Sequence, residues 1–78
     1  SKMEEEDNPK KWNVRDVVDR WLKHLKLSAD YSTLFLAENI NGKALSLMTE
    51  RDWQNMKLVM GDRKIIVEEV QKLFRSCN

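Results

Sequence analysis

The 78-residue sequence has little of what builds metal sites or disulfides: one cysteine, Cys77, and one histidine, His24. A single cysteine cannot form an intramolecular disulfide, and this pair cannot supply the four Cys and His ligands of a structural zinc site. We therefore expect no metal, no other cofactor and an intracellular, reducing environment, with nucleus and cytoplasm left open. Stability then has to come from apolar packing, to which the three tryptophans can contribute most.

Long hydrophobic runs and a dominant charge are also missing. No apolar run approaches the roughly 20 residues of a membrane helix, and the charged N-terminal segment lacks the hydrophobic stretch of a signal peptide. Fourteen basic and 13 acidic residues leave a formal charge of +1, so the whole-chain charge indicates no partner. With 41% hydrophobic residues the chain should fold, and its length fits one small domain.

The sequence also lacks the combinations of residues that catalysis needs. A side-chain nucleophile needs a base that a third group orients, and the only imidazole, His24, lies between Lys23 and Lys26 without a motif around it. The two glycines are too few and too far apart for a phosphate-binding loop. We predict no catalytic residue and no enzyme.

Apolar residues recur at intervals of three and four, the spacing of a helical face, in several segments. The first covers residues 14–25, where Asn13 can cap the helix and Asp16 lies in its first turn. The longest follows Gly61 and continues to Cys77, about four turns. These two segments predict the first helix and the main, last helix.

Three shorter helices are expected between them. Ser28 can cap the second, residues 43–48 supply the third, and Thr49 with Asp52 resembles a capping box at the start of the fourth. Asn41-Gly42 can close a β-hairpin, but neither flank alternates between polar and apolar residues. The sequence therefore predicts an all-α fold, a compact five-helix bundle with a long C-terminal helix.

The first eleven residues differ from the rest of the chain. They contain the run Glu4-Glu5-Glu6-Asp7 and then Asn8-Pro9. Proline disfavours helix at the residue before it, so the first helix is expected beyond Pro9. The predicted organisation is a disordered acidic tail over residues 1–11 and a helical domain over residues 12–77.

Three blocks in this order resemble the sterile alpha motif, or SAM, domain: WNVRDVVDRWL from Trp12, NINGKALSLMTERDW from Asn39 and GDRKI from Gly61. The resemblance covers about residues 12–73. It implies a non-catalytic protein-interaction module within a larger signalling, scaffold or transcription-regulatory protein. Two positions depart from the family pattern: Met56-Lys57 stands where the fourth helix usually ends in Leu-Gly, and Trp53 replaces a buried Leu.

SAM domains commonly associate head to tail, through a mid-loop surface on the central helices and an end-helix surface at the start of the last helix. The resemblance thus implies that the partner is a second copy or another SAM domain. The end-helix candidates are Lys57, Val59, Met60, Gly61, Asp62, Arg63 and Lys64, and the mid-loop candidates are Glu38, Asn39, Asn41, Glu50 and Asp52.

Regional charge is compatible with this pairing. Residues 28–55 carry two basic and four acidic side chains, whereas residues 57–64 carry three basic and one acidic. The same sums can arise from ordinary solvated helix faces, and Met60 can equally be a core residue. Two complementary surfaces and a chance distribution of charge therefore both stay open.

RNA binding is the alternative function, because some SAM domains hold an RNA hairpin at the start of the last helix. Lys57, Arg63 and Lys64 can contact phosphates, whereas Asp62 in the same patch would repel them. A membrane-surface contact through Lys23 and Lys26 has weaker support, since the neighbouring Trp21 is needed for the core.

Overall fold

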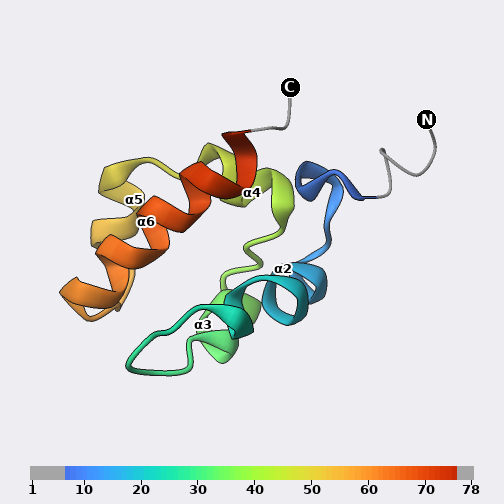
Figure 1. Cartoon of the computed structure of the whole chain (residues 1–78). Helices are drawn as coiled ribbons and strands as arrows, with labels where there is room; N and C mark the ends of the chain where they lie inside the picture. Colours follow the sequence, from blue (N-terminus) through green and yellow to red (C-terminus); the bar gives the residue numbers. More distant parts are fainter. Residues whose placement is uncertain (1–6, 76–78) are drawn as a thin grey trace.

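The computed structural model describes residues 7–75, which form five α-helices and two short 3₁₀ helices and contain no strand. The predicted all-α fold with a long last helix is therefore confirmed (Figure 1). Cys77, the expected end of that helix, lies outside the described residues. In chain order the elements are η1 (Pro9–Lys11), α2 (Val14–Arg20), η2 (Leu22–His24), α3 (Ser32–Ala37), α4 (Gly42–Leu47), α5 (Glu50–Asn55) and α6 (Met60–Arg75).

Side chains at the helix starts explain where two of the helices begin. The Asn13 side chain accepts a hydrogen bond from the Asp16 backbone N–H at 2.8 Å, and the Asp16 carboxylate accepts one from Asn13 N–H at 3.3 Å. Thr49 and Asp52 form the same reciprocal pair at the start of α5, at 3.2 and 2.9 Å. Each box satisfies two backbone donors that the helix itself leaves unpaired, which confirms both predicted caps.

The first predicted helix divides in two. α2 ends at Arg20, Trp21 adopts a non-helical backbone (φ −133°, ψ −62°), and the chain continues as η2. A 3₁₀ turn has about three residues per turn instead of 3.6, so Leu22 and Leu25 still pack against the core after the break. Hydrophobic spacing alone does not distinguish this arrangement from one continuous helix.

Residues 7–11 correct the prediction of an unstructured tail over that part of the chain; residues 1–6 lie outside the described residues. Pro9 is buried and opens η1, and Asn8 caps it by accepting from Lys10 N–H at 3.0 Å. Proline is well tolerated at a first helical position, where its missing N–H has no intrahelical partner to lose. Trp12 C=O then accepts from Gly42 N–H at 2.8 Å, which joins this turn to α4.

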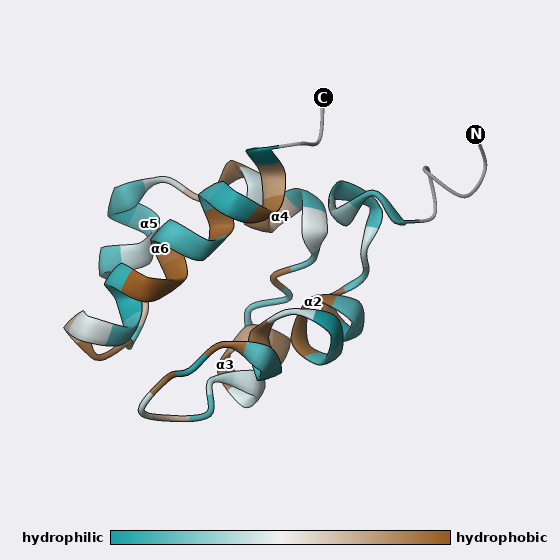
Figure 2. Cartoon of the chain, in the orientation of Figure 1, coloured by the Kyte–Doolittle hydropathy of each residue, from teal (hydrophilic) through white to brown (hydrophobic). Residues whose placement is uncertain are grey.

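The core lies between α6 and the shorter helices. Val17, Phe35, Leu45 and Ile66 are fully buried, and the Trp53 side chain is only 2% exposed. The Trp53 ring packs at a tilt on Phe35, with 6.1 Å between the ring centroids, so the enlarged residue at the family's leucine position fits in the core. Hydrophobic and hydrophilic stretches follow one another along α6 (Figure 2), as in an amphipathic helix whose apolar residues recur every three or four positions.

Candidate interaction surfaces

The start of α6 presents two adjacent apolar side chains to solvent. Val59 is 59% exposed and Met60, the first residue of α6, is 65% exposed. Gly61 and Lys64 are also exposed, whereas Arg63 is half-buried. Of the two alternatives for Met60, the structure therefore supports the surface position and not the core position.

Asp62 does not lie on this surface. Its side chain is turned inward and is 4% exposed. Its carboxylate accepts three hydrogen bonds: from Ser28 N–H at 3.0 Å, from the Ser28 hydroxyl at 2.6 Å and from the Tyr31 hydroxyl at 2.6 Å. Tyr31 Oη in turn accepts from Val59 N–H at 3.2 Å. We call Ser28, Tyr31, Val59 and Asp62 the Asp62 cluster; it joins the loop before α3 to the start of α6.

These contacts also set the ionisation of the cluster. Hydrogen bonds from the Ser28 hydroxyl, and then from Tyr31, lower the pKa of Asp62, because they favour its charged form. Burial, and then the hydrogen bond to Asp62, raises the pKa of Tyr31. The Asp62 carboxylate therefore stays charged but faces internal donors instead of a ligand at the surface.

The mid-loop candidates differ in what their side chains do. Glu38, Asn39, Glu50 and Asp52 are exposed. Asn39 also ends α3 with a left-handed backbone (φ 52°): its N–H bonds Leu36 C=O at 3.1 Å. With the bond from the next residue back to Phe35 C=O at 3.0 Å, this is a Schellman motif.

The side chains of Asn41 and Asp52 also accept hydrogen bonds from backbone N–H groups at helix starts. Asn41 is half-buried and caps α4 by accepting from Ala44 N–H at 2.8 Å. The hydrogen bonds from Thr49 lower the pKa of Asp52, which therefore stays ionised in the capping box. Both residues shape the backbone of this region, whereas Glu38 and Glu50 supply exposed charge.

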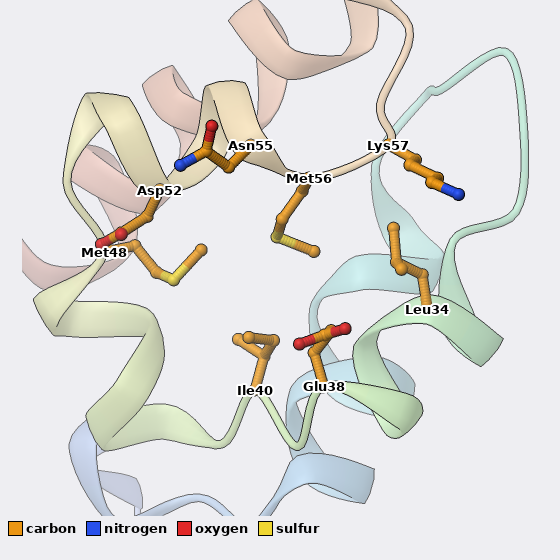
Figure 3. A pocket seen from close by; sticks show the side chains of 8 residues that line it. All are labelled: Leu34, Glu38, Ile40, Met48, Asp52, Asn55, Met56 and Lys57. Carbon is orange, nitrogen blue, oxygen red and sulfur yellow. The ribbon is translucent and has the colours of Figure 1, made fainter.

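A hollow of about 460 Å³ lies between α3 and α5 (Figure 3). Its apolar lining comes from α3, from the segment between α3 and α5, and from Met56 just after α5, whereas Glu38 and Asp52 contribute carboxylates. Lys57 borders the same hollow, so the structure brings this end-helix candidate to the two mid-loop carboxylate residues. The lining residues of this α3–α5 hollow are Leu34, Glu38, Ile40, Met48, Asp52, Asn55, Met56 and Lys57.

Sequence reasoning missed the part that Ser28 and Tyr31 play at the end-helix surface. It assigned Ser28 to a helix cap, but α3 begins at Ser32, and Ser28 bonds Asp62 instead. One signal was available, since a buried tyrosine needs a partner for its hydroxyl. That partner lies 31 positions away, and no local pattern points to it.

Residues 7–75 contain no group of three or more His, Cys, Asp or Glu side chains that could hold a metal ion. Within the same residues, no helix is long and apolar enough to span a membrane.

The described residues thus offer an exposed apolar pair at the start of α6 and a hollow lined by apolar and charged side chains. The family model of the SAM domain (sterile alpha motif) matches residues 10–74, and the chain therefore belongs to this family. SAM domains are generally non-catalytic modules for protein–protein interaction. Comparisons with curated proteins and with solved structures found no match.

Proposed function

We propose that this domain associates head to tail with a second copy of itself or with another SAM domain, as part of a larger signalling, scaffold or transcription-regulatory protein. The observation that carries the proposal is the exposed pair Val59 and Met60 at the start of α6. Contiguous apolar surface on a protein often marks an interaction site.

The two surfaces are complementary in kind. The end-helix surface combines this apolar pair with basic groups and consists of Lys57, Val59, Met60, Gly61, Arg63 and Lys64. The mid-loop surface combines the α3–α5 hollow with acidic groups and includes Glu38, Asn39, Asn41, Glu50 and Asp52. In this arrangement the apolar centre supplies affinity, and the charges set orientation and association rate. Asp62 supports the end-helix surface from beneath and does not touch the partner.

Sedimentation velocity over a range of protein concentrations, at low and at high salt, tests the proposal. We expect the sedimentation coefficient to rise with concentration, and to rise less at high salt because salt screens the charged rim. Met60→Asp, Arg63→Glu and Glu38→Lys should each keep the domain monomeric over the same range. Leu47→Asp is the matched control, because Leu47 is an apolar side chain of similar exposure, 67%, outside both surfaces.

Two results would contradict association. One is a wild-type domain that stays monomeric under every condition and binds no member of a panel of SAM domains. The other is a Leu47→Asp variant that loses association as fully as Met60→Asp does.

RNA-hairpin binding is the second candidate, favoured by the inward position of the Asp62 carboxylate beneath a basic start of α6. It would appear as binding of labelled RNA hairpins at low salt that weakens steeply with added salt, because bound phosphates release counterions. Lys64→Glu should then abolish RNA binding, whereas Met60→Asp should leave most of it. Absence of RNA binding at low salt removes this candidate.

A further inference from the structure

Ser28 occupies an unusual position for an exposed loop residue. It lies in the segment of residues 25–31 that joins η2 to α3, and the residue as a whole is exposed. Its hydroxyl nevertheless donates a 2.6 Å hydrogen bond to the buried carboxylate of Asp62 at the start of α6. One solvent-accessible residue therefore closes the contact between this loop and the helix end that bears Met60.

We propose that Ser28 is a phosphorylation site and that its phosphorylation releases the 25–31 loop from α6. Two hydrogen bonds join Ser28 to Asp62, one from the backbone N–H at 3.0 Å and one from the hydroxyl at 2.6 Å, and the second requires the hydroxyl proton. Phosphorylation removes that proton and adds a group of nearly two negative charges at pH 7. Like charges would then face each other at hydrogen-bond distance beside a buried carboxylate, so the closed arrangement loses its stability.

The reaction needs a protein kinase and ATP. The Ser28 hydroxyl oxygen forms the new bond to the γ-phosphorus, the bond from that phosphorus to the β–γ bridging oxygen breaks, ADP leaves, and the hydroxyl proton passes to the kinase base. Two exposed basic residues, Lys23 and Lys26, precede Ser28 by five and two positions. This spacing fits a kinase with an acidic peptide-binding site.

Access to the hydroxyl requires the loop to open briefly. Segments outside regular helices open locally at lower free energy than the core does. Ala29 and Asp30, the next two residues, are exposed. A kinase that captures the open loop would add the phosphate there, and the phosphate would then prevent closure. Phosphorylation thus shifts the population toward an open state that already exists.

Tyr31 connects the release of the loop to the end-helix surface. This residue lies in the same loop, and its hydroxyl both donates to Asp62 and accepts from Val59 N–H. Without it, the backbone that positions Val59 and Met60 loses its support. We therefore expect phosphorylation to weaken association through that surface by about tenfold or more, since a tenfold change corresponds to the loss of roughly one charged hydrogen bond. This last consequence rests on the proposed function, whereas loop release does not.

The first experiment treats the 78-residue chain with ATP and the catalytic subunit of a kinase that prefers basic residues before serine. Mass spectrometry then locates the phosphate, which we expect at Ser28 and which Ser28→Ala should lack. Phosphate on other residues but not on Ser28 overturns the assignment of the site.

The second experiment tests the mechanism on Ser28→Glu and on the phosphorylated chain. We expect the midpoint of thermal unfolding to fall by about 10 °C or more, and the Val59 amide to exchange its hydrogen faster. Ala29→Glu is the matched control, because it adds the same charge at the neighbouring exposed position. Equal falls for Ser28→Glu and Ala29→Glu would overturn the mechanism.

A double-mutant cycle isolates the contact itself. In an Asp62→Asn background the carboxylate charge is absent, so Ser28→Glu should lower the unfolding midpoint much less than it does in the wild type. Equal effects in both backgrounds also overturn the proposal. If the unmodified chain never associates, the proposed function fails, and the unfolding and exchange measurements still decide whether Ser28 controls the loop.

Discussion

At the scale of single residues, the sequence and the structure indicate different roles for Asp62. In the sequence it is the acidic member of a basic patch. In the structure its carboxylate accepts hydrogen bonds from Ser28 and Tyr31 and is nearly inaccessible to solvent. We therefore expect its charge to contribute to folding stability.

Asp62 should make stability depend on pH in the acid range. The folded-state pKa of Asp62 is lowered relative to the ordinary aspartate value of about 3.9. Its contribution is therefore present above that value and is lost as the pH falls through the lowered pKa. We expect Asp62→Asn to be less stable than wild type near neutral pH, and the difference to narrow as the pH falls below about 4.

Urea unfolding of both proteins at a series of pH values measures this difference. Asp30 and Asp52, whose pKa values are also lowered, titrate in both proteins and cancel in the comparison. A difference that stays constant from neutral to acid pH would mean that Asp62 does not act through its charge.

At the scale of elements, both glycines lie in the first turn of a helix, but only one of the two positions requires glycine. Gly42 is the first residue of α4, and a Cβ atom there would lie 1.8 Å from Pro9 O, a backbone atom that cannot swing away. Gly61 is the second residue of α6, and a Cβ atom there would meet nothing within 4 Å. Only Gly42 is required by packing.

Replacing each glycine by alanine should therefore give opposite results. We expect Gly42→Ala to destabilise the domain by about 1–3 kcal/mol, because η1 and α4 must move apart. Gly61→Ala should stabilise it by up to about 1 kcal/mol through its better helix propensity. Urea unfolding of the two variants beside wild type provides the measurement, and a similar loss in both would contradict the close approach of Pro9 to Gly42.

At the scale of the whole molecule, charged side chains are not grouped in space as they are grouped along the sequence. Residues 57–64 are basic as a segment. In space, however, Lys57 borders the α3–α5 hollow together with Glu38 and Asp52 (Figure 3). The Asp62 carboxylate is buried. The proposed end-helix surface therefore depends on the exposed pair Val59 and Met60 with Lys64 more than on the total charge of its segment.

Head-to-tail pairing makes a specific prediction for mixed variants. Met60→Asp leaves the mid-loop surface intact, and Glu38→Lys leaves the end-helix surface intact. Neither variant should associate alone, but an equimolar mixture should form a dimer and nothing larger, because each chain then offers one usable surface. Light scattering during size-exclusion chromatography measures the mass, and a mixture that stays monomeric while wild type associates would exclude this pairing.

The sequence was sufficient wherever the deciding contacts are local. The capping boxes at Asn13 and Thr49 join residues only three positions apart, and they place two helix starts correctly. Hydrophobic spacing predicts the all-α class and the long last helix, because a helical face repeats within a single segment. Three ordered blocks of residues likewise carry the family resemblance that the match over residues 10–74 confirms.

Tertiary structure decided what depends on distant partners. Pro9 begins an ordered turn because that turn packs on Gly42, and Ser28 faces Asp62, 34 positions away, instead of capping α3. Local sequence can specify a helix and its ends, but which side chains remain exposed is set only when the helices pack, and the surfaces of this SAM domain follow from that packing.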